Sequence, residues 1–178
     1  MTSPPDKRVA FEVPVVQTAR LTLRGFTDAD LDRYAAWLGD DDTARYLGGK
    51  ALDRGDAWRS LAMMMGHWAL RGYGMWAVVE KASGALVGRV GLWNPEGWPG
   101  IECGWLIAPD RRKLGFAQEA AVAAIEWGRA ELALRRIISI IHVDNVASIK
   151  TAVALGEERI EERTIRGFPC VIYGMDLP

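Results

Sequence analysis

Three consecutive cations, residues 111–113, stand directly before two small residues, Gly115 and Ala117, in the segment RRKLGFAQEA. If a helix begins at Phe116, its first backbone N–H groups have no partner inside the helix, and its dipole adds positive potential at the same point. The small residues let a ligand approach the backbone closely, and phosphate groups bind at helix starts of this kind. The segment is therefore a candidate site for a phosphorylated ligand. The alternative is a basic loop in water whose Gly and Ala only allow a tight turn.

Two established phosphate-binding motifs fit this segment less well. A Walker-type loop is excluded because the chain contains no Gly-Lys-Ser or Gly-Lys-Thr sequence. A dinucleotide fingerprint would place Gly115, Ala117 and Ala120 at its three small positions, with Asp144 at the end of the next strand. Its second glycine is Ala here, and a basic turn separates Gly115 from the preceding strand, whereas a dinucleotide turn follows its strand at once. The dinucleotide interpretation is open but disfavoured.

Glu102 is the one carboxylate in the apolar run from Ile101 to Ala108. Burial of a carboxyl group there would raise its pKa toward the value of a useful general base. The alternatives are an exposed residue at a strand end and a partner for an arginine. Among the other titratable candidates, His142 could change charge near neutral pH, but a structural role is preferred for it and for His67.

Aromatic and sulfur-containing residues gather in two further places. The turn between Trp93 and Trp98 could overhang a cleft, and the simpler alternative is that these residues and Trp105 pack on the sheet. The run Met63–Met65 and Trp68 are interpreted as core or cleft lining.

The elements that would position these residues follow from periodicity and turn chemistry. Strands alternate or concentrate β-branched residues, helices carry apolar residues on one face, and Gly or Pro interrupts them. The predicted strands are residues 20–24, 75–80, 85–93, 101–108, 136–143, 159–165 and 170–177, and the predicted helices are one capped by Thr27, then 54–70, 116–131 and 145–155. A turn is expected over residues 167–169. The order of elements indicates an α+β fold with a mixed sheet.

Length and composition bound the remaining possibilities. The chain has 178 residues and is expected to form one domain over residues 15–178, after a flexible proline-rich arm at residues 1–14. The net charge of −1 gives no field that would attract nucleic acid or an anionic membrane. We expect Cys103 and Cys170 to be reduced core residues, with a disulfide as the alternative. The absence of a membrane-length apolar run or a signal peptide in the sequence predicts a cytoplasmic protein.

From Glu102 onward the sequence resembles the GNAT superfamily of acetyl-CoA-dependent N-acetyltransferases. It is most similar to the RimJ/RimL-like branch, which includes enzymes that act on protein N-termini. The acetyl-CoA motif of the family, Gln/Arg-x-x-Gly-x-Gly/Ala, matches residues 112–117, and its later Asn-x-x-Ser followed by Leu-Gly matches residues 145–148 and 155–156. Residues 18–24 are similar to the opening strand of this branch. The resemblance therefore covers nearly the whole chain.

The resemblance implies a fold, a cosubstrate and site residues. The fold would be a twisted, mostly antiparallel sheet of about seven strands flanked by about four helices, with a splayed parallel pair of strands that holds the cofactor. Acetyl-CoA would be the cosubstrate, with backbone groups on the pantetheine arm, the basic turn on the pyrophosphate and an Asn across the gap; no metal is implied. The residues assigned to acetyl-CoA are Leu106, Ile107, Arg112, Lys113, Leu114, Gly115, Phe116, Ala117, Gln118 and Asn145. The residues assigned to catalysis are Glu102 and Ser148.

The chain departs from the family pattern at two positions. Many members carry a Tyr that protonates the departing thiolate, and the matching residue here is Ala152. Ser148 is the replacement that the resemblance suggests, and the alternative is a helix-start hydroxyl that only bonds backbone. The residue after Leu-Gly is commonly Phe or Tyr, and here it is Glu157, a change expected to concern packing more than chemistry.

Taken together, the sequence predicts an enzyme that moves the acetyl group of acetyl-CoA directly to a primary amine. The acceptor partner would be a protein N-terminus or a small-molecule amine, and neither nucleic acid nor a membrane is expected as a partner. The alternative is a non-catalytic acyl-CoA-binding module of the same fold, which the missing Tyr keeps open. Both a monomer and a homodimer fit the sequence.

Overall fold

The computed structural model describes residues 11–178, so most of the predicted arm lies outside the described residues. The strands are β1 (Val16–Gln17), β2 (Leu21–Arg24), β3 (Met75–Glu80), β4 (Leu86–Trp93), β5 (Glu102–Ile107), β6 (Arg136–His142), β7 (Glu158–Ile165) and β8 (Phe168–Asp176). The helices are α1 (Leu31–Leu38), α2 (Asp41–Ala44), α3 (Arg54–Arg71), α4 (Phe116–Leu132) and α5 (Val146–Ala154), with 3-10 turns at Asp28–Asp30 and Pro109–Arg111. The α+β prediction is confirmed.

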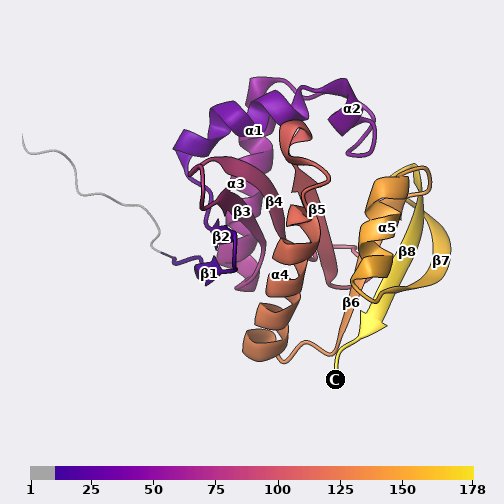
Figure 1. The fold of residues 1–178 in the computed structure, drawn as a ribbon. Coiled ribbons are helices and arrows are strands. Elements are labelled where there is room, and N and C mark those ends of the chain that lie inside the picture. The colour runs from indigo at the N-terminus through magenta and orange to yellow at the C-terminus, as the bar shows by residue number, and fades with distance from the viewer. Residues whose placement is uncertain (1–10) are drawn as a thin grey trace, which may run out of the picture.

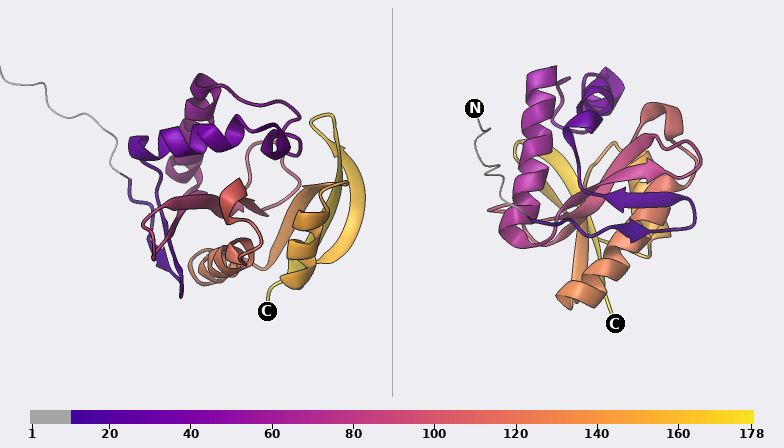
Figure 2. Two further views of the ribbon diagram at one scale, coloured as in Figure 1. Left: turned by 45° about the horizontal axis from the view of Figure 1, so that its top comes forward. Right: turned by 90° about the vertical axis from the view of Figure 1, so that its left-hand side faces the viewer.

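All eight strands belong to one mixed sheet in the order β1-β2-β3-β4-β5-β6-β8-β7. Every neighbouring pair is antiparallel except β5 and β6, which are parallel and register at one point only, Glu102 opposite Ile138. Beyond that point the two strands diverge, and Figure 2 shows β6, β8 and β7 turning away from the rest of the sheet. The splayed parallel pair is therefore present as predicted.

The helices cover both faces of the sheet. In Figure 1, α4 and α5 lie in front of the sheet, α3 lies behind it, and α1 and α2 lie at the top. Apolar residues of α4 pack with β3, β4 and β5 in one core cluster, those of α1 and α3 form a second cluster on the opposite face, and α5 covers β6 and β8 in a third. The separation of the third cluster from the first follows the divergence of β5 and β6.

Three of the eight tryptophans form one edge-to-face cluster in the main core. Trp68 lies with its ring centroid 4.7 Å from that of Trp76, and Trp127 lies 5.6 Å from Trp68 and 5.1 Å from Trp76. Such pairs stabilise by about 0.5–1.5 kcal/mol beyond the area that they bury. Trp68 is thus a core residue, which agrees with one of its two predicted roles.

The structure differs from the sequence prediction at three local features. β1 and α2 are too short to show a period, so neither was predicted. The turn between β7 and β8 is Arg166–Gly167, with φ of 50° and 86°, which is the two-residue geometry that matches the twist of a hairpin. Phe168 and Pro169 therefore begin β8, and the prediction of a turn over residues 167–169 is wrong at those two positions. No helix within residues 11–178 is long and apolar enough to cross a bilayer.

Candidate active site

The divergence of β5 from β6 frees backbone groups on one edge of β5. The N–H of Ala108 donates to the carbonyl of Val87 in β4 at 2.9 Å, and direction alternates along a strand, so Leu106 also directs its backbone groups to β4. The backbone groups of Trp105 and Ile107 then face the gap. Because backbone direction alternates along β5, Ile107 stays a candidate for binding an extended ligand through its backbone. Trp105 takes the place of Leu106 as the second candidate.

The N-terminus of α4 has the geometry of an anion site. Gly115 has φ of 81° and Lys113 has φ of 63°, so the chain makes two left-handed steps before the helix. The first helical bond is donated by Glu119 to the carbonyl of Gly115, which leaves the N–H groups of residues 116–118 without a partner inside the helix. A Cβ atom added at Gly115 would lie 3.3 Å from Nη2 of Arg20. The left-handed φ thus favours glycine here, whereas an added Cβ would require only a small shift of the flexible Arg20 side chain.

Arg20 fixes this turn from the side of β2. Its Nη1 donates to the carbonyl of Leu114 at 2.9 Å, its Nε donates to Oε2 of Glu119 at 2.6 Å, and its guanidinium lies 4.7 Å from the ring centroid of Phe116. Thr18 donates its hydroxyl to Oε1 of the same carboxylate at 2.6 Å. Partial burial raises the pKa of Glu119, but hydrogen bonds from Thr18 and Arg20 outweigh it and hold the pKa below its usual value. The turn is therefore shaped by protein contacts alone.

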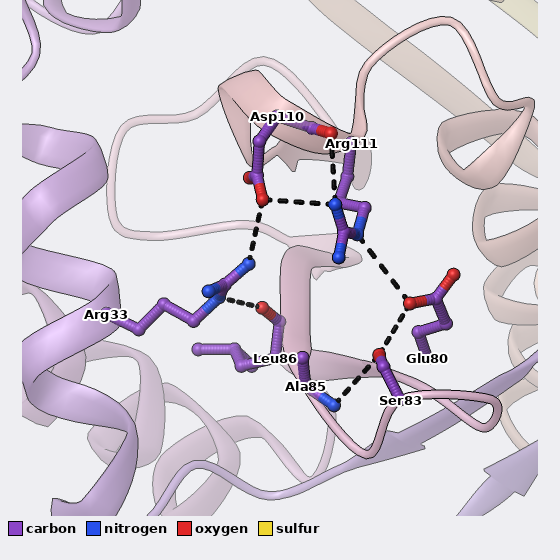
Figure 3. Close-up of polar contacts among 7 residues, drawn as sticks. All are labelled: Arg33, Glu80, Ser83, Ala85, Leu86, Asp110 and Arg111. Carbon is purple, nitrogen blue, oxygen red and sulfur yellow. Dashed lines mark hydrogen bonds and ion pairs between the residues drawn. The ribbon is translucent and has the colours of Figure 1, made fainter.

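The three cations of the turn have separate partners. Arg111 lies 3.6 Å from Oε2 of Glu80 and 3.2 Å from Oδ2 of Asp110. Figure 3 shows this network continuing from Asp110 to Arg33, whose Nε donates to the carbonyl of Leu86. Arg111 therefore anchors the turn to β3 directly and to α1 through Asp110 and Arg33.

Arg112 and Lys113 are placed differently. Arg112 donates to Oγ1 of Thr43 in α2 at 2.7 Å and to the carbonyl of Ile107 at 3.4 Å, which brings it to the edge of the gap. Lys113 makes no ion pair with any residue that the structure describes. Arg112 also has only neutral partners within residues 11–178, so both cations are available to an anionic ligand.

A cavity of about 490 Å³ opens where β5 and β6 separate. It borders Glu102, Ser148 and Asn145, which lie far apart in the sequence and are brought together here. Its apolar wall comes from the segment after α2, from α3, from the end of β4 and from the β7–β8 hairpin. The residues of this wall include Leu47, Met63, Trp93, Trp98 and Phe168.

Glu102 is the carboxylate of this cavity. Its Oε2 accepts a hydrogen bond from Nε1 of Trp98 at 2.7 Å. Burial raises the pKa of Glu102 to about 7, although the hydrogen bond from Trp98 and the positive charge of Arg89 act in the opposite direction. A carboxyl group with this pKa exchanges protons readily at neutral pH.

Ser148 and Asn145 lie across the gap from β5. Asn145 is the N-cap of α5, and its Oδ1 accepts the N–H of Ser148 at 3.2 Å. The hydroxyl of Ser148 accepts a hydrogen bond from Nε1 of Trp105 at 3.3 Å, which leaves its own proton to donate. Ala152 is fully buried on the inner face of α5 and does not line the cavity.

Glu157 has a different environment from the one expected for it. It is 3% exposed, and its Oε1 lies 2.8 Å from Oγ of Ser139, which also lies 2.9 Å from the carbonyl of Cys103. A hydroxyl has one proton, so Ser139 satisfies both acceptors only if Glu157 is protonated and donates. Burial raises the pKa of Glu157 to about 7, with an opposing hydrogen bond from Ser139 and a further increase from Glu102.

Glu157, expected to concern packing more than chemistry, is thus a buried carboxyl group in a hydrogen-bonded pair with Ser139. Its Oε2 is the one buried side-chain polar atom without a partner among the residues that the structure describes. The signal that could have identified it was the carboxylate itself, which stands at a position where the family pattern has an aromatic residue.

The remaining candidates divide between cavity and core. His142 borders the cavity with its ring centroid 5.6 Å from that of Tyr46. His67 is held at both ring nitrogens, by the carbonyl of Tyr73 at 2.7 Å and the N–H of Asn94 at 3.1 Å, and it stacks on Trp93 at 4.3 Å. The structural role predicted for His67 is confirmed, and it supports one wall of the cavity.

The two cysteines and the metal-binding side chains add no further site. Cys103 and Cys170 are both free and buried, as predicted. Within the described part of the chain, no group of three or more His, Cys, Asp or Glu side chains is placed to hold a metal ion.

Comparison with known proteins identifies the family of the chain. Residues 20–158 match the family described as the acetyltransferase (GNAT) domain. The uncharacterized N-acetyltransferase YoaA of Bacillus subtilis is 27% identical over 151 residues, which is 82% of this chain and 84% of that protein.

Solved structures agree. An acetyltransferase from Agrobacterium tumefaciens superposes with a TM-score of 0.83 at 25% identity, over 95% of this chain and 98% of that one. RimL, a ribosomal α-N-protein acetyltransferase solved with coenzyme A, superposes with a TM-score of 0.75 at 14% identity, over 92% and 98% of the two chains. The fold, the splayed strands and the match over most of its length show that the chain belongs to the GNAT acetyltransferase family.

Proposed function

We propose that this acetyltransferase takes the acetyl group from acetyl-CoA and transfers it directly to a primary amine. One observation carries the proposal: β5 and β6 pair at one point only, and the cavity where they separate holds a carboxyl group with a pKa of about 7. The anion site at the N-terminus of α4 follows the end of the same strand β5, so β5 connects an anion site with a proton acceptor. This arrangement suits a donor with a phosphorylated handle and a reacting amine.

The residues on the donor side fit acetyl-CoA. The free N–H groups of residues 116–118 and the ammonium of Lys113 would bind the pyrophosphate, with Arg112 beside them. The backbone groups of Trp105 and Ile107 would pair with the amides of the pantetheine arm. The contacts of Arg20 support this proposal, because they hold the turn in a shape that presents these N–H groups before a ligand binds.

The cavity side fits transfer to an amine. The carboxylate of Glu102 would take a proton from the acceptor ammonium, and the neutral nitrogen would attack the thioester carbonyl. The new C–N bond forms as the C–S bond breaks; the nitrogen then loses its second proton, which replaces the proton that the Ser148 hydroxyl gives to the departing sulfur, and Glu102 releases the first proton to solvent. Ser148 would supply the proton of the sulfur in place of the missing Tyr, since the N–H of Trp105 occupies its acceptor side.

A non-catalytic acyl-CoA-binding module is the second candidate, and Ala152 is the observation that favours it. Membership of the RimJ/RimL-like branch, an acceptor that is a protein N-terminus and a location in the cytoplasm also remain proposals. The free cysteines support the last of these, since thiols stay reduced there.

Thermal unfolding with acetyl-CoA tests the donor half. At about 100 times its Kd, a ligand of the native state stabilises by about 2.7 kcal/mol, which raises the Tm of a domain of this size by roughly 5–10 °C. The double variant Arg112→Glu, Gly115→Asp should lose this shift. Arg129→Glu, an exposed charge reversal at the other end of α4, should retain it. Absence of any shift in the unmodified protein would contradict both candidates.

Release of free thiol from acetyl-CoA separates the two candidates. The enzyme should release thiol when offered amino acids, amines or N-terminal peptides, and should yield acetylated product by mass spectrometry. A clear thermal shift without product from any acceptor would favour the binding module.

A further inference from the structure

Arg89 brings a guanidinium group into the acceptor cavity without a carboxylate partner. It lies in β4 on the face that α1 and α3 cover, with Nη1 3.7 Å from Sδ of Met64 and its guanidinium 6.0 Å from the ring centroid of Tyr34. No Asp or Glu within residues 11–178 forms an ion pair with it. A charge that is half-buried without a partner lowers the stability of the fold, so it calls for an explanation.

The free N–H groups of Arg89 face the cavity. Arg89 is one of the residues that line it, and Oε2 of Glu157 is the only buried side-chain polar atom left without a partner among residues 11–178. The unpaired nitrogens of Arg89 are therefore accessible, and the accessible space beside them is the cavity. A planar guanidinium with free donors binds carboxylates in bidentate fashion.

Arg89 and Glu102 face the same space from neighbouring strands. Trp93 of β4 lies opposite Glu102 of β5. The next pair on the same face, Gly91 opposite Gly104, lies between that pair and Arg89. The two glycines carry no side chains of their own, and the methyl group of Met75 packs over Gly104 beside the Glu102 carboxylate. The guanidinium of Arg89 also lowers the pKa of Glu102, which shows that the two groups are within electrostatic reach.

Two further hydrogen-bond donors line the cavity, one near Tyr34 and one near Trp98. Ser60 of α3 lines the cavity with a hydroxyl 3.0 Å from that of Tyr34. Arg166, in the β7–β8 turn, adds a second guanidinium 5.1 Å from the ring of Trp98. An acceptor with only an ammonium group would meet two cations here, whereas an acceptor that also bears a carboxylate would match them.

We propose that the acceptor is an α-amino acid with an apolar side chain, whose carboxylate binds Arg89 while its amine faces Glu102. The apolar wall around Met63, Trp93 and Phe168 would receive the side chain. This proposal rests on the acetyltransferase function proposed above. It selects a small amino acid over a peptide N-terminus, in which the first carboxylate is an amide.

Matched acceptors test the proposal on the unmodified enzyme. Thiol release is measured with L-leucine, L-methionine and L-phenylalanine, with the amide of each, and with short peptides that begin with the same residues. The free acids should have kcat/KM values at least about tenfold above those of the amides, as expected for hydrogen bonds to a charged group. Equal values, or a preference for amides or peptides, would overturn the proposal.

Arg89→Gln tests the residue itself. The variant should raise KM for the acids by at least about tenfold and leave KM for the amides unchanged, so that the preference disappears. Arg89→Lys should restore part of the preference because it keeps the charge. Arg159→Gln, an exposed substitution in β7, is the matched control and should behave as the parent. An unchanged acid-to-amide ratio in Arg89→Gln would overturn the assignment.

Product binding keeps the proposal testable if turnover is slow. With coenzyme A present, N-acetyl-L-phenylalanine should raise the Tm more than its amide does, and failure of the acid to bind more tightly would also overturn the proposal. A missing acetyl-CoA shift would instead contradict the proposed function as a whole. The acetyl-CoA shift of Arg89→Gln shows that this variant is folded.

Discussion

The donor end of the site and the acceptor cavity are built in opposite ways. The donor end is one continuous segment, residues 112–118, whose binding groups are backbone N–H groups and whose shape is fixed by Arg20. The acceptor cavity takes single side chains from β4, β5, β6, α3, α5 and the β7–β8 hairpin. Backbone recognition at a helix start requires a fixed spacing of small residues, whereas side-chain recognition requires only that the fold bring scattered residues together. The donor end can therefore be predicted from a sequence motif, and the acceptor cavity cannot.

Glu102→Gln should impair the acceptor cavity and leave the donor end intact. The amide cannot accept the proton of the acceptor ammonium, so kcat should fall by about 10²–10⁴-fold, the usual contribution of a general base. The Tm shift with acetyl-CoA should stay unchanged, because the donor end is intact. Glu126→Gln, an exposed change on α4, is the control. A variant with full activity would remove Glu102 from the catalytic role proposed for it.

Gly115→Val should impair the donor end, where acetyl-CoA is proposed to bind. Valine has a strongly disfavoured φ here, and its side chain would occupy the space beside the N-terminus of α4 and Arg20, so acetyl-CoA should bind roughly 100-fold more weakly. Gly84→Val is the matched control, since Gly84 also has a left-handed φ, of 67°, but has no atom within 4 Å of an added Cβ. Both variants should lose stability, and calorimetric titration should show that only the first loses affinity. Equal affinity in the two variants would contradict an anion site at this turn.

Glu157→Gln should change how stability depends on pH. The pKa of Glu157 is about 7 in the folded protein and near 4.5 in an unfolded chain, so the native state binds more protons between these values. The free energy of unfolding contributed by this group is therefore greatest below pH 4.5 and is lost as pH rises through 7, by at most about 1.4 kcal/mol per pH unit.

Glutamine can donate to Ser139 without a titrating proton, so Glu157→Gln should gain stability over the parent between pH 5 and 8. Urea unfolding at each pH unit measures this, with exposed Glu158→Gln as control. Burial lowers the pKa of His67, which acts in the opposite direction, but His67 is present in both proteins and cancels in the difference. A difference that does not change with pH would mean that Glu157 is not protonated in the native state.

Arg20→Gln should have the smallest effect on acetyl-CoA affinity. It tests whether Arg20 supports the donor turn or binds the ligand itself. It removes the side-chain hydrogen bonds to Leu114 and Glu119 and the ring contact that hold the donor turn, and it leaves the proposed phosphate-binding groups in place. Acetyl-CoA affinity should fall by roughly 3- to 10-fold, because these bonds act on the ligand only through the shape of the turn. Arg136→Gln, at an exposed ion pair on β6, should leave affinity unchanged. A loss as large as that of Gly115→Val would indicate that Arg20 itself binds the ligand.

Much of the fold was predictable because its long elements have strong periods. The start of α4 at Phe116 and the bounds of β3 agree with the sequence prediction, and the turn before α4 was recognised from the spacing of Gly115 and Ala117. In contrast, α2 has four residues and is held by the Asp40 cap and by Arg112. The contact with Arg112 joins residues far apart in the sequence, so the residues of α2 alone carry no pattern that predicts the helix.

The site was predictable only where chemistry and motif coincide. Glu102 stood out as a lone carboxylate in an apolar strand, and the structure places it in the cavity. Arg89 sits in a strand where a half-buried cation looks like any solvent-facing residue, and Glu157 looked like a packing change. Arg111 is visible in the sequence as one of three cations, but its partner Glu80 belongs to a distant hairpin, so the ion pair has no local signal.

The pH dependence of acetyl transfer tests the central claim most directly. Thiol release and acetylated product are measured together, with saturating acetyl-CoA and an apolar amino acid, from pH 5.5 to 9. If Glu102 is the proton acceptor, kcat should rise with an apparent pKa near 7, and Glu102→Gln should lose that inflection together with most of the rate. Tight acetyl-CoA binding with no acetylated amine at any pH would contradict the account.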